Sequence, residues 1–104
     1  MKKIFIAITL ISSILYGHGG HNHKSKSAIQ QIAKKKIEQL INGNKIDKSW
    51  SNPYISNTKK KQFGTKMEWV ISLENSYIKD KTKQVIYVFV SEGGVVKGAN
   101  YTGK

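Results

Sequence analysis

The sequence predicts an α+β domain in which one amphipathic helix packs on a four-stranded antiparallel sheet. Three observations predict this fold: an apolar stripe of helical spacing in residues 27–42, a later region with alternating apolar residues, and a continuously apolar run at residues 85–90. Side chains repeat about every 3.6 residues in a helix and about every 2 in a strand, so a change of period marks a change of element. A single helix laid across such a sheet gives a two-layer domain.

The helix is predicted to begin near Ser27 and to end at Asn42-Gly43. Its apolar residues recur at three- and four-residue spacing, which forms one stripe along a helix: Ile29, Ile32, Ala33, Ile37, Leu40 and Ile41. We expect Ser27 to cap the first turn, with Gln30 in the capping-box position three residues later. Lysines 34–36 suit the negative end of the helix dipole, and Gly43 supplies the stop.

The first two strands are predicted at residues 54–63 and from Lys66 to about Glu74. The first is polar, and its lysine run at residues 59–61 is a common protection of an edge strand against further pairing. In the second, four apolar side chains alternate with a mixed set and are expected to face the helix: Met67, Trp69, Ile71 and Leu73. Gly64-Thr65 marks the turn between the two strands.

The last two strands are predicted at residues 85–90 and from Val95 to Tyr101. The run at 85–90 is β-branched and aromatic, which is typical of a central strand. Gly93-Gly94 is expected to form a two-residue hairpin loop. We expect Trp69 and Phe89 to belong to the core, because a small domain without disulfides depends on its large apolar side chains.

The amino terminus resembles a secretory signal peptide. Lys2 and Lys3 precede an apolar run at residues 4–16, and glycines follow at once. A membrane-spanning helix is the alternative, but it needs about 20 apolar residues. The sequence therefore predicts a cleaved signal peptide at 1–17, a flexible tail at 18–26 and a domain at 27–104, with no membrane span after processing. Cleavage after Gly17, Gly19 or Gly20 fits the small residues present.

The tail carries all three histidines of the chain, His18, His21 and His23. Neutral imidazole is a good ligand for Cu(II), Ni(II) and Zn(II), and the intervening glycines let the chain wrap round an ion. The spacing H-x-x-H-x-H thus makes these three residues candidate metal ligands. The alternative is that the tail is a disordered spacer of biased composition. Thiolate sites are excluded, because the chain has no cysteine.

The chain is strongly basic, with a formal net charge of +12 from 18 basic residues, all of them lysine, against six carboxylates. Arginine is the residue that reads phosphate and guanine bidentately, so its absence argues against a nucleic-acid partner. An anionic envelope surface or an envelope protein fits diffuse positive charge better. Compositional bias together with solubility is the simpler alternative explanation.

Nothing in the sequence forms a catalytic constellation, and the protein is not expected to be an enzyme. Histidine and cysteine do not occur after residue 23. Glu68 and Glu74 share a predicted strand face, yet six residues at about 3.3 Å each separate them too far to act as a carboxylate pair. Trp50 and Tyr101, in a connection and in the last strand, are the aromatic candidates for contact with a partner.

Several segments together resemble a family of small exported bacterial proteins that is catalogued only as a domain of unknown function. They are the signal peptide, the tail Gly-His-Gly-Gly-His-Asn-His-Lys, the helix start at residues 28–36, the segments 45–50 and 68–72, and the ending Ala-Asn-Tyr-Thr-Gly-Lys. The layout is similar to the PepSY type. The resemblance implies a periplasmic helix-plus-sheet module and carries no established activity, cofactor or catalytic residue.

Two functional hypotheses follow from the sequence. In the first, a periplasmic accessory protein binds Cu, Ni or Zn through its histidine tail, in metal transport or homeostasis. In the second, a non-catalytic PepSY-like module contacts an envelope protein or peptide, with a peptidase-inhibitory role as one form of this, and the tail is a spacer.

Overall fold

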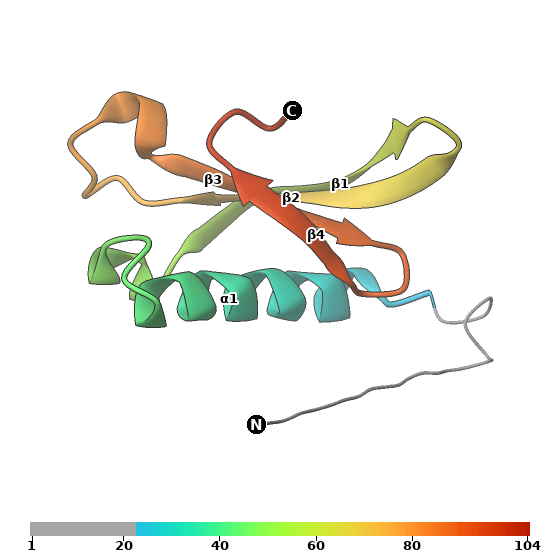
Figure 1. The fold of residues 1–104 in the computed structure, drawn as a ribbon, viewed down its shortest axis with the longest axis horizontal. Coiled ribbons are helices and arrows are strands. Elements are labelled where there is room, and N and C mark those ends of the chain that lie inside the picture. Colours follow the sequence, from blue (N-terminus) through green and yellow to red (C-terminus); the bar gives the residue numbers. More distant parts are fainter. Residues whose placement is uncertain (1–22) are drawn as a thin grey trace, which may run out of the picture.

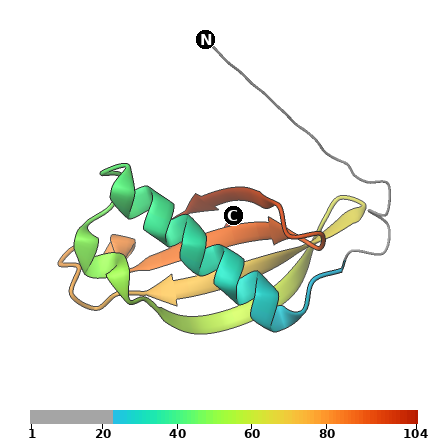
Figure 2. The same ribbon diagram turned by 90° about the horizontal axis from the view of Figure 1, so that it is seen from below.

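The computed structural model describes residues 23–104, and these form the predicted α+β fold. In chain order the elements are α1 (Lys26–Asn42), η3 (Lys48–Ser51), β1 (Tyr54–Phe63), β2 (Lys66–Glu74), η4 (Lys81–Lys83), β3 (Val85–Ser91) and β4 (Val96–Asn100). Helix α1 lies across one face of the sheet (Figures 1 and 2). The predicted signal peptide, His18 and His21 lie outside the described residues.

The N-cap of helix α1 lies two residues before the expected one. Its N-cap is Ser25, whose Oγ accepts a hydrogen bond from the Ala28 amide at 3.1 Å, so the assignment of Ser27 was wrong. The Lys24 amide donates to the Glu92 carbonyl at 3.0 Å, which holds the chain extended just before Ser25 and leaves that serine to cap. Gln30 does not close a capping box; its Nε2 donates to Thr58 Oγ1 of β1 at 2.9 Å. The predicted end at Asn42-Gly43 is confirmed.

The four strands pair in the order β1-β2-β3-β4, all antiparallel, so β1 is an edge strand and β3 is central, as predicted. The β3–β4 loop differs from the prediction. The Ser91 amide donates to the Val95 carbonyl at 2.8 Å, which leaves three residues, Glu92 to Gly94, in the loop. Gly94 has φ +94°, a conformation that favours glycine, and a Cβ there would lie 3.1 Å from Ile32 Cδ1, so the space is tight as well.

The core lies between α1 and the sheet. Its buried members are Ile29, Ala33, Ile37, Trp50, Ile71, Leu73, Ile86, Val88 and Val90. Trp69 packs against this cluster as predicted, although it is only partly buried. Met67 is 38% exposed, contrary to the expectation that it faces the helix. It pairs only with Gln62, in the part of the β1–β2 hairpin that extends past the first β2–β3 pair, Glu68 with Ser91.

The other face of the sheet, which we call the open face, has no helix over it, and the C-terminus lies on this side (Figure 1). Val70 and Phe89 are nevertheless 3% and 7% exposed. The Phe63 ring meets the Phe89 ring edge-on at 5.9 Å between centroids. Phe89 is therefore buried, as expected of a core residue, but it lies outside the helix-facing cluster.

No helix within residues 23–104 is long and apolar enough to cross a membrane.

Candidate functional site

The tail joins the domain at the β3–β4 loop. Besides the backbone hydrogen bond from Lys24 to Glu92, the Glu92 carboxylate accepts from Lys60 Nζ at 3.0 Å. The same ammonium lies 5.1 Å from the centre of the Trp69 ring. The segment just before α1, strand β1 and the β3–β4 loop thus meet at the N-terminal end of α1.

His23 is exposed and is the one candidate metal ligand within the described residues. The hydrogen bond from Lys60 lowers the pKa of Glu92, burial opposes this, and the charges of Lys60 and His23 lower it further. Glu92 is therefore an ionised carboxylate within electrostatic reach of His23. Residues 23–104 contain no group of three or more acidic or imidazole side chains placed to hold a metal ion.

The other carboxylates with a shifted pKa serve as caps. Hydrogen bonding to Ser49 lowers the pKa of Asp47 at the start of η3, and hydrogen bonding to Thr82 lowers the pKa of Asp80 at the start of η4. A general acid needs a raised pKa, which is the opposite shift. These two groups accordingly stabilise short helical turns.

The two aromatic candidates for partner contact lie in different surroundings. Trp50 belongs to the core and is 1% exposed, so it presents almost no surface to a partner. Tyr101 is 38% exposed, and Lys83 Nζ lies 5.9 Å from its ring centre. They line separate hollows. A binding role for either residue stays a prediction.

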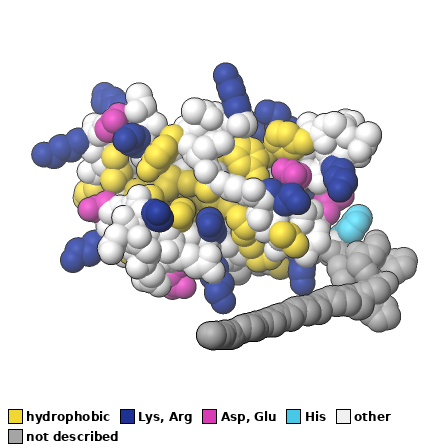
Figure 3. Space-filling model, in the orientation of Figure 1, with side chains coloured by type: hydrophobic (Ala, Val, Ile, Leu, Met, Phe, Trp, Pro, Cys, Tyr) yellow, Lys and Arg dark blue, Asp and Glu magenta, His cyan; other side chains and the backbone are white. Residues whose placement is uncertain are grey.

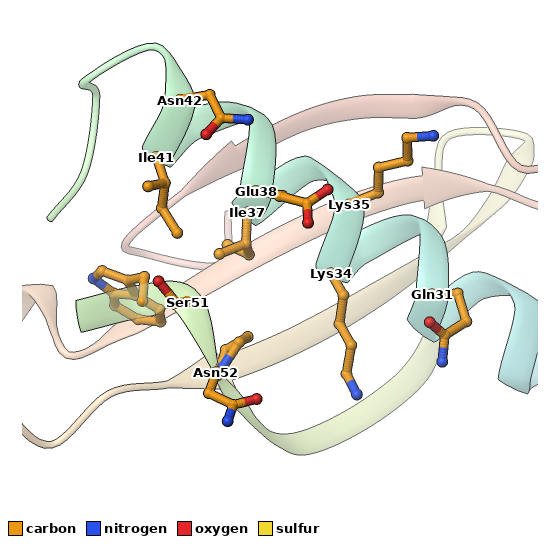
Figure 4. A pocket seen from close by; sticks show the side chains of 11 residues that line it. Gln31, Lys34, Lys35, Ile37, Glu38, Ile41, Asn42, Ser51 and Asn52 are labelled. Carbon is orange, nitrogen blue, oxygen red and sulfur yellow. The ribbon is translucent and has the colours of Figure 1, made fainter. Parts of the chain in front are cut away.

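A hollow of about 540 Å³ lies between α1 and the chain around η3 (Figure 4). Trp50 and Pro53 line it on one side, and Lys34, Glu38 and Ile41 line it from α1. Lys34 extends toward the chain that follows η3, whereas Lys35 points away (Figure 4). The polar groups do not converge on one point, which a specific ligand site would require.

Another hollow, of about 350 Å³ and distinct from the one that Tyr101 lines, lies on the open face of the sheet. Its lining comes from β1, β2, β3 and the C-terminal segment: Asn57, Lys59, Lys61, Val70, Ser72, Tyr87, Thr102, Gly103 and Lys104. None of these residues was singled out as a candidate from the sequence. The alternation in β2 could have indicated that Val70 and Ser72 share a face, but not that the C-terminal segment closes one side of it.

Lysine side chains project from many parts of the surface in Figure 3 rather than from one patch. The only ion pair within residues 23–104 joins Lys60 to Glu92. The remaining positive charge is thus spread over the domain, which fits either diffuse attraction or plain solubility.

A family model described as "Family of unknown function (DUF6488)" matches residues 1–104. No curated protein matches the chain. No solved structure matches it either.

Proposed function

We propose that this chain, which belongs to the DUF6488 family along its whole length, is an exported, non-catalytic accessory protein that binds Cu, Ni or Zn through His18, His21 and His23. In this proposal a PepSY-like periplasmic domain carries the metal-binding tail. The observation that supports it best is the attachment of the tail: the chain is hydrogen-bonded to the β3–β4 loop directly after His23.

The attachment of the tail to the β3–β4 loop affects the affinity of the tail for a metal ion. An unstructured peptide must offset its ordering entropy when it wraps round an ion. The hydrogen bond from Lys24 fixes the residue next to His23, so part of that cost is met by folding of the domain. Glu92 is within electrostatic reach of His23, but the ammonium of Lys60 offsets most of its charge. The Oε2 of Glu92 accepts the hydrogen bond from Lys60, so we assign Glu92 no ligand role.

The position of signal cleavage decides the ligand set. Cleavage after Gly17 gives His18 a free α-amine, so amine and imidazole can chelate together. Cleavage after Gly20 starts the chain at His21-Asn22-His23 and places a histidine third from the amine, an arrangement suited to square-planar Cu(II) or Ni(II). The mass of the exported protein distinguishes the two cases, and recovery of the uncut chain in membranes would contradict export.

The test is calorimetric titration of the mature protein with each metal ion. Replacing all the tail histidines that remain by alanine should abolish stoichiometric Cu(II) or Ni(II) binding, because no other histidine or cysteine is present. Affinity should also fall as the pH drops through about 6.5, since imidazolium does not bind metal. Asn22→Ala is the matched control and should bind as the unmodified protein does. Equal affinity in the histidine-free variant would refute the proposal.

The competing proposal is a PepSY-like interaction module that contacts, and in one form inhibits, an envelope protein, with the tail as a spacer. The open face favours it, because a whole side of the sheet lacks a covering helix. If replacing the tail histidines abolishes the biological effect of the protein in the cell, the metal-binding proposal is favoured. If that effect is retained, the interaction module is favoured.

A further inference from the structure

The hollow on the open face contains a buried polar group that the fold itself does not explain. Ser72 is 7% exposed, although it is polar and lies on the side of the sheet away from α1. Its carbonyl accepts a hydrogen bond from Ser56 Oγ at 3.3 Å. Its own hydroxyl has no hydrogen-bond partner within residues 23–104, and the residue lines the hollow. Buried polar groups normally have partners, so this hydroxyl points to a ligand or bound water.

The surroundings of Ser72 are positively charged. Lys59 and Lys61 lie on the same face of β1, because Lys59 pairs with Val70 and Asn57 with Ser72. Neither ammonium has an ion-pair partner in the described part of the chain. Lys104 also lines the hollow.

The remaining lining suits a small ligand. Val70, 3% exposed, lines the hollow with an apolar side chain, and Tyr87 adds an aromatic ring and a phenol. Gly103 presses against that ring: a Cβ at Gly103 would lie 3.1 Å from Tyr87 Cδ1. Small-molecule sites typically combine apolar walls with a few placed polar groups and begin at about 300 Å³. The hollow, at about 350 Å³, is near that lower limit.

We propose that this hollow binds a small anion bearing a phosphate or carboxylate group, held by Lys59 and Lys61 and hydrogen-bonded by the Ser72 hydroxyl. Lysine ammonium groups and hydroxyls are donors that such oxyanions accept. The site uses no histidine and is separate from the metal proposal, so either proposal can fail without the other. Glu68 pairs with Lys61 across the strands and shares this face, and its charge opposes the anion.

The test is titration of the mature protein with inorganic phosphate in one arm and succinate in the other, followed by amide NMR. Saturable shifts are expected at Ser72 and Tyr87 in at least one arm, and the stronger arm identifies the anionic group. Absence of site-specific shifts up to about 10 mM, well above a dissociation constant of about 1 mM, would overturn the proposal.

Variants distinguish this site from diffuse attraction. Lys59→Gln with Lys61→Gln should weaken binding at least about tenfold, because two close charges are lost. The matched control is Lys79→Gln with Lys81→Gln, which removes the same charge from the exposed segment before β3 and should have little effect. An equal loss of affinity in the two double variants would mean that net charge alone attracts the anion, and would refute the proposed site.

Two single substitutions test the roles of Ser72 and Glu68 in the proposed site. Ser72→Ala should weaken binding about threefold to tenfold with an unchanged melting temperature, since it removes one hydrogen bond to the ligand. Ser76→Ala, on an exposed loop, is its control. Glu68→Gln should strengthen binding, because it removes the opposing charge next to Lys61. Unchanged affinity in both Ser72→Ala and Glu68→Gln would contradict the assignment.

Discussion

The two faces of the sheet bury side chains by different means. On the helix side, α1 covers a continuous aliphatic cluster, and Ile71, Leu73 and Val88 are fully buried. On the open face, Val70, Ser72 and Phe89 reach 3–7% exposure with only neighbouring strands and the C-terminal segment around them. Burial on the first face is apolar throughout, whereas the second includes an unsatisfied hydroxyl. This difference separates a surface that stabilises the fold from one that is able to take a ligand.

The neighbouring residues Ile71 and Val70 test this difference most directly. Ile71→Ala should lower the free energy of unfolding by about 2–5 kcal/mol, the usual cost of a large-to-small change in a closed core. Val70→Ala should cost less, about 1–2 kcal/mol, because it removes about two methylene equivalents beside an existing hollow. Urea denaturation measures both. Equal losses would mean that the open face is as tightly packed as the helix side.

The stability of helix α1, which covers one face of the sheet, should depend on its N-cap, Ser25. Ser25→Ala should cost about 1 kcal/mol, because the Ala28 amide loses its acceptor. Ser27→Ala, within the first turn, should change stability by a few tenths of a kcal/mol at most, since alanine is the better helix former. Thermal unfolding of both variants measures the difference, and a larger effect at Ser27 would contradict the observed cap.

The smallest expected effect is the contribution of Glu92 to stability, which depends on pH. The hydrogen bond from Lys60 lowers the pKa of Glu92 in the folded protein below its ordinary value of 4.5. Its contribution to stability is therefore present above that value and is lost as the pH falls through the lower folded pKa. Glu92→Gln should reduce the melting temperature slightly at neutral pH and not at strongly acidic pH. The same loss at both pH values would show that charge is not the cause. Glu74→Gln, on an exposed residue, is the control.

The sequence was sufficient to predict the fold class, the strand order implied by hairpins and the bounds of β1 and β2, because periodicity and glycine turns are local signals. Ser25 was missed because Ser25 and Ser27 are both good caps, and the choice depends on a contact with Glu92 far along the chain. Met67 was misplaced because alternation predicts the face of a residue but not how far the helix extends over it.

The hollow on the open face could not be predicted for a similar reason. β1 contains an irregularity between Ile55 and Asn57, where Ser56 is left unpaired. Strict alternation counted from Ile55, which packs on the core, would place Lys59 and Lys61 beneath the helix. The contact of Gly103 with Tyr87 is also tertiary and leaves no local signal. The histidine tail shows the reverse case, since its three candidate ligands were proposed from the sequence alone.

The unpaired Ser56 is a residue of β1 that can be lost without moving the lysines to the other face of the sheet. A strand slipped by one residue turns every side chain to the opposite face. Deleting Ser56 would not cause such a slip, because Ile55 already pairs with Leu73 and Asn57 with the next residue, Ser72, so that Lys59 and Lys61 would stay on the open face. A deletion at this position should thus be better tolerated than the loss of a paired residue later in β1, and natural variation in the length of this strand is expected at the bulge.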